Sequence, residues 1–192
     1  MNYAPMIIGI SGISGAGKTT FAKHLSQSNS WTAIFWDDFD GISSSPDNLV
    51  KWYKQGKDYD EWNYPDLARV LEELKNRNII PHPVLKTELQ PTNIIVFDAP
   101  LGRLHEQTGQ SINLWVHLEV PLDIALARRA IRDYKDKPLK ENFFEDLECY
   151  LNESRPLFFD SDLKEKADLV IDGTLDVLTQ AEQLKKYLKE YR

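Results

Sequence analysis

The sequence predicts an α/β protein, a three-layer sandwich with a parallel β-sheet between two layers of helices. Five short apolar runs have the length and the Ile, Val and Leu content of strands that are covered on both faces. Segments with apolar residues at helical spacing fall between these runs. Strands that alternate with helices are typical of a parallel sheet, because a crossover helix connects each strand to the next.

Each expected element follows from a local pattern. Strands are expected over residues 6–11, 32–36, 94–98, 113–119 and 168–172. Helices are expected over residues 18–27, 66–76, 122–134 and 174–191, and around Phe143, Leu147 and Leu151. Pro121 precedes the third of these helices, and its fixed φ angle suits a helix start. Residues 41–47, 55–65 and 80–92 are rich in Ser, Gly, Pro or aromatics, so we expect loops or short helices there.

Length and charge limit the possible functions. The chain has 192 residues without a repeat or a break in composition, so we expect a single domain over residues 1–192. Its formal net charge of −7 disfavours nucleic acid as a partner, because an acidic surface repels phosphates. No apolar run approaches the ~18 residues that a membrane span needs, and residues 1–10 lack the pattern of a signal peptide. We therefore expect a cytoplasmic protein without a membrane partner. Its oligomeric state stays open.

The chain has a single cysteine, Cys149, which lies in a segment with a helical pattern. One cysteine cannot form an internal disulfide, and this fits a reducing compartment. A free cysteine more often packs as a small apolar side chain than reacts, so we expect Cys149 to be packed.

Residues 12–19 read Gly-Ile-Ser-Gly-Ala-Gly-Lys-Thr and match the phosphate-binding P-loop pattern in full. The motif follows the first expected strand and opens the first expected helix, as its mechanism requires. Glycines let successive N–H groups surround phosphate oxygens, and the helix directs the positive end of its dipole at the same anion. The expected ATP-binding residues are Gly12, Ser14, Gly15, Ala16, Gly17, Lys18, Thr19 and Thr20. Lys18 is expected to reach the β- and γ-phosphates, and the Thr19 hydroxyl to bind Mg²⁺.

Carboxylates end two further strands, at the edge where α/β sheets bind ligands. Asp37 and Asp38 follow the second strand, and Asp37 is the favoured proton acceptor for a substrate hydroxyl, with Asp38 as the alternative. Asp37 is also a candidate for metal binding. Asp98 ends the third strand, and this is typical of an acid that holds Mg²⁺ directly or through water. A phosphate-binding loop combined with such a base predicts an ATP-dependent kinase of a small molecule.

Arginines on the helix that is expected after the fourth strand suggest a lid over about residues 128–145. Arg128 and Arg132 are four residues apart and share a helix face, and Arg129 can pair with Asp133. Arginines that close over a transferring phosphoryl group stabilise its charge and exclude water. The charged tract 133–140 is expected to be part of this lid.

Several of these segments together resemble the uridine kinase and nicotinamide riboside kinase group of P-loop kinases. The resemblance rests on residues 9–20, on Asp37-Asp38-Phe39, on Arg128-Arg129 with Arg132-Asp133, and on residues 150–156 and 167–171. It covers most of the chain, and the P-loop is its most specific part.

The resemblance implies a strand order of 2-3-1-4-5, a helical lid, and transfer of the ATP γ-phosphate to a ribose 5′-hydroxyl. It implies that Asp37 is the general base and that Arg128 and Arg132 are the lid arginines. Residues 63–66, Asn-Tyr-Pro-Asp, resemble a substrate-side segment of uridine kinases. The sequence departs from the group at Asp98-Ala99-Pro100, where Glu-Gly is usual, and at residues 81–93, which are shorter than the base-contacting hairpin of uridine kinases.

The acceptor is the least defined part of the expectation. Asp38, Trp62, Tyr64 and Arg103 are candidate substrate contacts, and the aromatic side chains among them could stack on a flat ring. A nucleoside-type acceptor is favoured, and a pantothenate or sugar kinase is the alternative. A regulatory NTP-binding switch is a further alternative, although the Asn-Lys-x-Asp pattern of a guanine-reading loop is absent from the sequence.

Overall fold

A computed structural model of the chain describes residues 4–135, 143–159 and 162–191. Its five main strands run close to the expected residues, because each is a short apolar run that ends at a polar or turn residue. They are β1 (Met6–Ser11), β2 (Thr32–Phe35), β5 (Ile94–Asp98), β6 (Leu114–Glu119) and β7 (Leu169–Asp172). The α-helices are α1 (Lys18–Asn29), α2 (Leu49–Lys54), α3 (Pro65–Lys75), α4 (Glu106–Gly109), α5 (Leu122–Tyr134), α6 (Phe143–Cys149), α7 (Asp162–Glu165) and α8 (Val177–Glu190).

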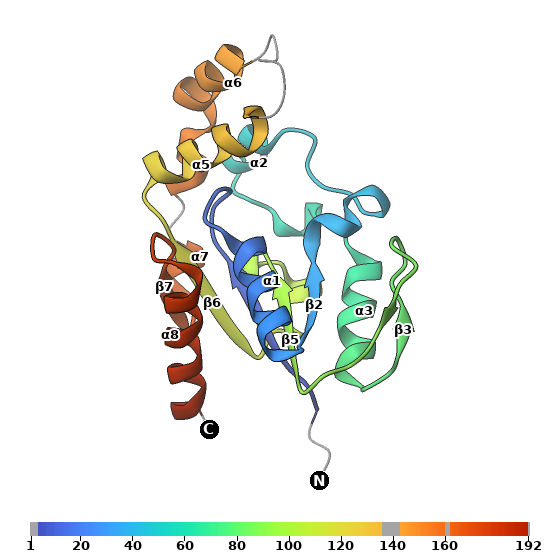
Figure 1. The fold of residues 1–192 in the computed structure, drawn as a ribbon. Coiled ribbons are helices and arrows are strands. Elements are labelled where there is room, and N and C mark those ends of the chain that lie inside the picture. The colour runs from blue at the N-terminus through green and yellow to red at the C-terminus, as the bar shows by residue number, and fades with distance from the viewer. Residues whose placement is uncertain (1–3, 136–142, 160–161, 192) are drawn as a thin grey trace.

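The five strands form one parallel sheet in the order β2-β5-β1-β6-β7 (Figure 1). Counted along the chain without the short strands β3 (Ile80–Pro81) and β4 (Glu88–Leu89), this is the order 2-3-1-4-5, as the resemblance implied. The central strand β1 pairs with β5 on one side and with β6 on the other. The carboxyl ends of β1, β2 and β5 therefore meet at one edge of the sheet, as expected for a ligand site.

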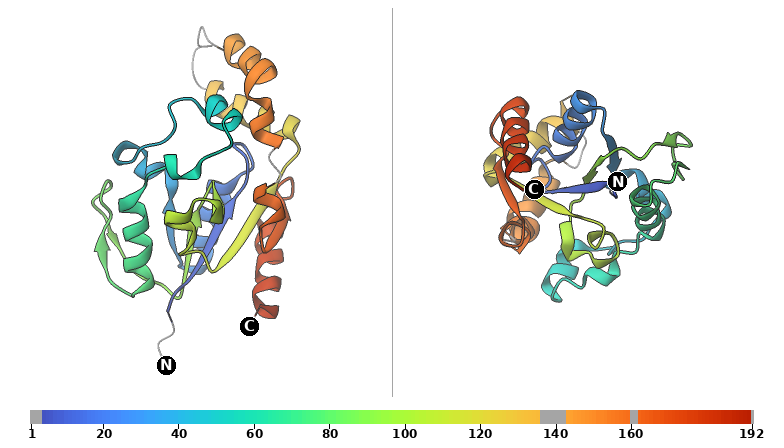
Figure 2. Two further views of the ribbon diagram at one scale, coloured as in Figure 1. Left: turned by 180° about the vertical axis from the view of Figure 1, so that it is seen from behind. Right: turned by 90° about the horizontal axis from the view of Figure 1, so that it is seen from below.

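Helices cover both faces of the sheet (Figure 2). The strand side chains alternate between two cores, one on each face. In β6, for example, Trp115 packs into the core that contains α3, whereas Leu114 and Val116 pack into the core that contains α1 and α8. The three-layer prediction is thus confirmed. Within the described residues, no helix is long and apolar enough to cross a membrane.

Four local predictions were inexact. Trp36 does not extend β2 but opens a 3₁₀-helix, η1 (Trp36–Ile42). Helix α8 begins at Val177, because the side chain of Asp176 caps it by accepting hydrogen bonds from the N–H groups of Leu178 and Thr179. Residues 80–92 include an antiparallel hairpin of β3 and β4 where loops or short helices were expected. The prediction that Cys149 is packed was wrong, since its side chain is exposed at the end of α6.

A buried histidine lies under the phosphate-binding edge. His117 of β6 is 7% exposed, and its Nδ1 lies 3.0 Å from Oγ of Ser11 at the end of β1. The Ser11 hydroxyl also accepts a 2.7 Å hydrogen bond from Nε1 of Trp115. Burial lowers the pKa of His117 from 6.5 to about 4, and the nearby Glu119 opposes this only in part.

Because the folded-state pKa of His117 lies below its unfolded value, protonation favours the unfolded chain. The stability that neutral His117 allows is complete above pH 6.5 and is lost as the pH falls toward about 4. We expect this group to lower the free energy of unfolding by about 2 kcal/mol between pH 7.5 and pH 5. Denaturant titrations of the wild type and of His117→Gln would show a shallower pH dependence in the variant. Parallel pH profiles would contradict the assignment.

Candidate active site

The P-loop connects β1 to α1 in the way its sequence requires. Gly12, Gly15 and Gly17 have φ angles of 149°, 91° and 99°, which side chains rarely tolerate. Gly15 also lies against α5, and a Cβ atom at this position would be 2.4 Å from the carbonyl oxygen of Ala125. The loop is therefore fixed both by its own backbone geometry and by contact with α5.

Gly15→Ala is expected to lower the free energy of unfolding by about 1–3 kcal/mol and to weaken nucleotide binding at least tenfold. The added methyl group meets backbone atoms, which cannot rotate away as a flexible side chain would. Gly41→Ala is the matched control, because its Cβ has no atom within 4 Å, and we expect a change of at most about 0.5 kcal/mol. Chemical denaturation and calorimetry with an ATP analogue measure both effects. Equal behaviour of the two variants would contradict the prediction.

Lys18, Thr19 and Asp98 form a charged cluster at the base of the loop. The Thr19 hydroxyl donates a 2.6 Å hydrogen bond to Oδ2 of Asp98, which is only 5% exposed. Burial raises the pKa of Asp98, and Lys18 and Thr19 act against this. Burial likewise lowers the pKa of Lys18, with Asp98 and Asp37 opposing. The cluster is thus a partly compensated group of charges that a polyphosphate and a cation would complete.

The other carboxylate oxygen of Asp98, Oδ1, is buried and has no hydrogen-bond partner among the residues that the structure describes. Unpartnered buried oxygens are uncommon because their desolvation is costly. A Mg²⁺ ion, which prefers hydroxyl and carboxylate oxygens, fits the Thr19 and Asp98 pair. In the described parts of the chain, no group of three or more His, Cys, Asp or Glu side chains forms a metal cage, so such an ion would need oxygens from its ligand.

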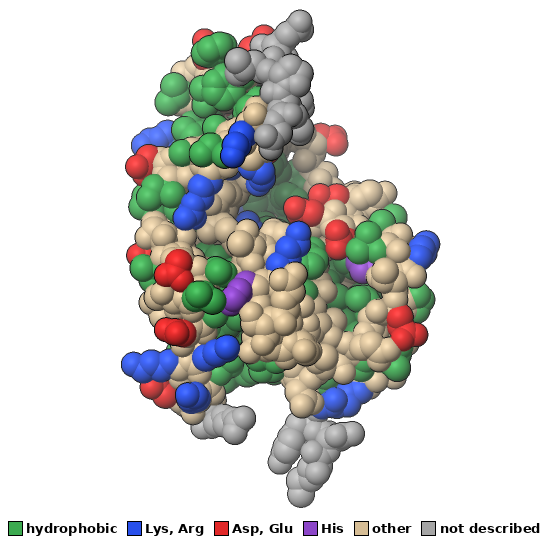
Figure 3. Space-filling view, viewed as in Figure 1, with side chains coloured by type: hydrophobic (Ala, Val, Ile, Leu, Met, Phe, Trp, Pro, Cys, Tyr) green, Lys and Arg blue, Asp and Glu red, His purple; other side chains and the backbone are tan. Residues whose placement is uncertain are grey.

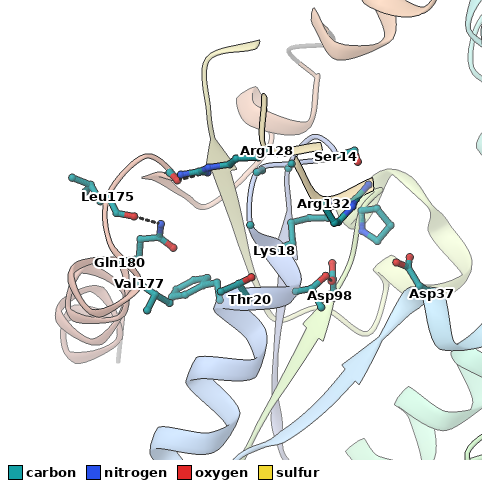
Figure 4. A pocket seen from close by; sticks show the side chains of 18 residues that line it. Ser14, Lys18, Thr20, Asp37, Asp98, Arg128, Arg132, Leu175, Val177 and Gln180 are labelled. Atoms are coloured by element: carbon teal, nitrogen blue, oxygen red, sulfur yellow. Dashed lines mark hydrogen bonds between the residues drawn. The ribbon is translucent and has the colours of Figure 1, made fainter. Parts of the chain in front are cut away.

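A cavity of about 1010 Å³ opens above the P-loop. Five charged side chains from four elements line it, as Figure 4 shows: Lys18 of α1, Asp37 of η1, Asp98 of β5, and Arg128 and Arg132 of α5. All eight expected ATP-binding positions also line it, namely Gly12, Ser14, Gly15, Ala16, Gly17, Lys18, Thr19 and Thr20. Figure 3 shows the hollow from outside, bordered by both basic and acidic side chains below the region of α5 and α6.

The two adjacent aspartates after β2 face different surroundings. Asp37 lines the cavity, where its charge acts on Lys18 and Arg132. Asp38 is directed toward the hairpin, with its Oδ2 3.7 Å from Nε2 of the buried His82. This separation favours Asp37 over Asp38 as the group that can contact a ligand in the cavity.

The arginines of α5 also differ in their surroundings. Arg128 and Arg132 line the cavity from one helix face, as their spacing predicted. Arg128 donates a 2.9 Å hydrogen bond to the carbonyl of Gly173, and Arg132 donates to both carboxylate oxygens of its neighbour Asp133. Arg129 instead lies over the ring of Phe158, 4.9 Å from its centroid. Within the expected lid at 128–145, residues 136–142 lie outside the described part of the chain.

Comparison with known proteins agrees with this geometry. The family model described as an AAA domain matches residues 8–149. Uridine kinase from Ureaplasma urealyticum is 31% identical over 153 residues, which cover 70% of this chain and 72% of that protein. Uridine kinase from Clostridium tetani is 25% identical over 186 residues, which cover 89% of this chain and 88% of that protein.

The chain belongs to the AAA domain family, in the uridine kinase group of P-loop kinases. Its fold is shared more widely. A sugar kinase from Janibacter sp. superposes with a TM-score of 0.58 at 18% identity, over 96% of this chain and 95% of that one. The protein is therefore a small-molecule kinase of the P-loop fold, and ATP-dependent activity follows from its family.

Some residues that line the cavity of this kinase carried no sequence signal. Pro100 follows the Asp98 strand end, Leu175 precedes α8, and Val177 and Gln180 lie in its first turn. Gln180 is 6% exposed and its Nε2 donates a 2.8 Å hydrogen bond to the carbonyl of Leu175, which fixes this turn against the cavity. Only folding brings this distant segment to the P-loop.

The candidate substrate contacts of the kinase have different surroundings. Tyr64 is 2% exposed and its ring lies 4.1 Å from that of Trp36. Trp62 packs edge-on against Trp36 and Trp52, so both aromatic candidates are part of a packed cluster behind η1. Arg103 does not line the cavity. Its guanidinium pairs with Asp168 at 2.7 Å and donates hydrogen bonds to backbone carbonyls. These contacts stabilise the sheet at the amino ends of β6 and β7, the edge opposite the P-loop.

Proposed function

We propose that this kinase transfers the γ-phosphate of ATP to a hydroxyl group of a nucleoside-type small molecule, with Mg²⁺ as its metal. The observation that supports this most strongly is Asp37, an accessible carboxylate that shares one cavity with Lys18 and the P-loop. A base on the wall opposite the phosphate-binding loop is what transfer to a hydroxyl needs.

The proposed mechanism assigns one task to each charged group. The P-loop amides and Lys18 bind the phosphates and neutralise them. Asp37 accepts the proton of the attacking hydroxyl and orients its oxygen. Arg128 and Arg132 exchange their present hydrogen bonds, to Gly173 and Asp133, for phosphate oxygens and stabilise the charge of the transferring group.

Thr19 and Asp98 are the proposed holders of Mg²⁺. Their support is the buried Oδ1 of Asp98, which has no hydrogen-bond partner within the described part of the chain, in the carboxylate that the Thr19 hydroxyl contacts. When bound, the ion would neutralise charge on the phosphates. Gly173, Leu175 and Val177 form the wall that we assign to the nucleotide base, since they line the cavity beyond the P-loop.

The nucleoside-type acceptor rests on the names of the relatives, which are uridine kinases at 25–31% identity. The test is a panel of acceptors with Mg-ATP, read as ADP release and as phosphorylated product by mass spectrometry. The panel contains uridine, cytidine, nicotinamide riboside, pantothenate and simple sugars. We expect a nucleoside-type compound to raise ADP release well above the acceptor-free rate. A response only to pantothenate or to a sugar would overturn the acceptor class.

A further inference from the structure

The 3₁₀-helix η1 places a second carboxylate beside Asp37. Side chains three residues apart eclipse one another in a 3₁₀-helix, and each residue rises by ~2 Å. Asp37 and Asp40 are three apart within η1, so they share a face and are offset by ~6 Å along it. Asp40 is exposed, and it does not belong to the residues that line the P-loop cavity. It therefore lies one turn beyond the proposed base, outside the P-loop cavity.

Asp40 is held in place by a buried tyrosine. The Tyr64 hydroxyl donates a 2.8 Å hydrogen bond to Oδ1 of Asp40. Tyr64 itself is fixed by its ring contact with Trp36 and by its backbone N–H, which donates a 2.6 Å hydrogen bond to Oε1 of Gln107. A carboxylate that is oriented by a buried donor is preorganised, and its second oxygen stays available to a ligand.

Asp37 and Asp40 carry charges of the same sign on η1, whereas the cations of the cavity, Lys18 and Arg132, act on Asp37. The pKa of Asp40 is raised by burial and by the charge of Asp37, whereas Tyr64 lowers it by donating its hydrogen bond. Asp38, between them in sequence, faces His82 instead. Arg103, which was a candidate substrate contact, is paired with Asp168 away from the cavity. An acceptor molecule thus meets two carboxylates on η1, and a carboxylate on that acceptor would be repelled.

Building on the proposed function, we propose that Asp40, oriented by Tyr64, is a specificity-determining residue for the phosphate acceptor. Its Oδ2 accepts a hydrogen bond from a second donor on the acceptor, a hydroxyl or a cationic nitrogen, while Asp37 acts on the reacting hydroxyl. The site selects neutral polyhydroxy or cationic acceptors and rejects those that carry a carboxylate. This selection comes from charge and spacing on η1, apart from the phosphate-binding machinery.

The test compares Asp40→Asn with the wild type in steady-state kinetics with Mg-ATP. Uridine and nicotinamide riboside serve as the neutral and the cationic acceptor, and pantothenate as the anionic one. We expect the KM for uridine and nicotinamide riboside to rise about tenfold in Asp40→Asn, because one charge-assisted hydrogen bond to the acceptor is lost. The KM for ATP should stay within about twofold, and the ratio of kcat/KM for pantothenate to that for uridine should rise.

Two further variants keep this test decisive. Tyr64→Phe removes the orienting hydroxyl without changing the charge, and we expect a smaller rise in acceptor KM in the same direction. Asp47→Asn makes the same chemical change at an exposed loop residue and should behave as the wild type. An active wild type whose acceptor KM and preference are unchanged by Asp40→Asn overturns this inference and leaves the proposed function standing. A wild type that phosphorylates none of the panel overturns both.

Discussion

Asp37→Asn is expected to lower the kcat of phosphoryl transfer by about 10²- to 10⁴-fold, the usual contribution of a general base. The amide keeps the size of the side chain but cannot accept the hydroxyl proton. Asp37 belongs to the exposed face of η1 and does not contribute to the buried core, so the variant should fold. Calorimetry with Mg-ATP should give an affinity close to that of the wild type, because the P-loop and Lys18 are unchanged.

Asp38→Asn is the matched control for this experiment. It makes the same substitution one residue further on, where the carboxylate lies 3.7 Å from His82 rather than in the cavity. We expect its kcat to stay within about tenfold of the wild-type value, because the substitution can shift η1 but does not remove the proton acceptor. If Asp38→Asn lost the larger part of the activity while Asp37→Asn kept it, the two roles would have to be exchanged.

Lys18→Met is the second variant with a large expected effect. We expect kcat/KM for ATP to fall by at least about 10²- to 10³-fold, since one preorganised charge at a developing anion contributes that much in other enzymes. The residue lies at the start of α1, and its charge compensates Asp98 and Asp37 across the cavity. Steady-state kinetics and calorimetry with Mg-ATP separate the loss of rate from the loss of binding.

Folding of the Lys18→Met variant should be nearly normal. The substitution removes the cost of burying the Lys18 charge, which lowers the pKa of Lys18, and this offsets the loss of a compensating charge beside Asp98 and Asp37. Met also has a similar length. The thermal midpoint without nucleotide should change by no more than about 4 °C. Lys23→Met is the control on the same helix, with its ammonium group 5.6 Å from the ring centroid of Phe35. A Lys18 variant with the activity of the Lys23 variant would contradict the role of Lys18.

The strands and the P-loop were predictable from sequence because their determinants are local. Each strand is a run of apolar residues that suits burial on both faces, and β1 and β5 begin and end at the expected residues. The P-loop is one continuous motif, so its position at the β1–α1 junction followed from the order of residues alone. Predicted boundaries were wrong where a capping side chain sets the end of an element, as Asp176 does at the start of α8.

Other features depended on contacts between distant segments. The sequence favoured Asp37 but left Asp38 as an alternative, because their surroundings are set by how η1 lies between the cavity and His82. Gln180 reaches the P-loop cavity only through the pairing of β7 with β6, which places the start of α8 beside it. The pairing of Arg103 with Asp168 likewise joins residues 65 positions apart.

The sequence by itself determined that this protein is an α/β phosphate-binding protein with Lys18, Thr19 and a strand-end acid at Asp98. Those features are encoded within single segments by spacing, glycine content and apolar runs. The tertiary structure alone decided which side chains share the cavity, which oxygen of Asp98 has no hydrogen-bond partner among the described residues, and which of Asp37 and Asp38 lines the cavity. These relations depend on packing between distant segments, and the energy of that packing cannot be inferred from the sequence of any single segment.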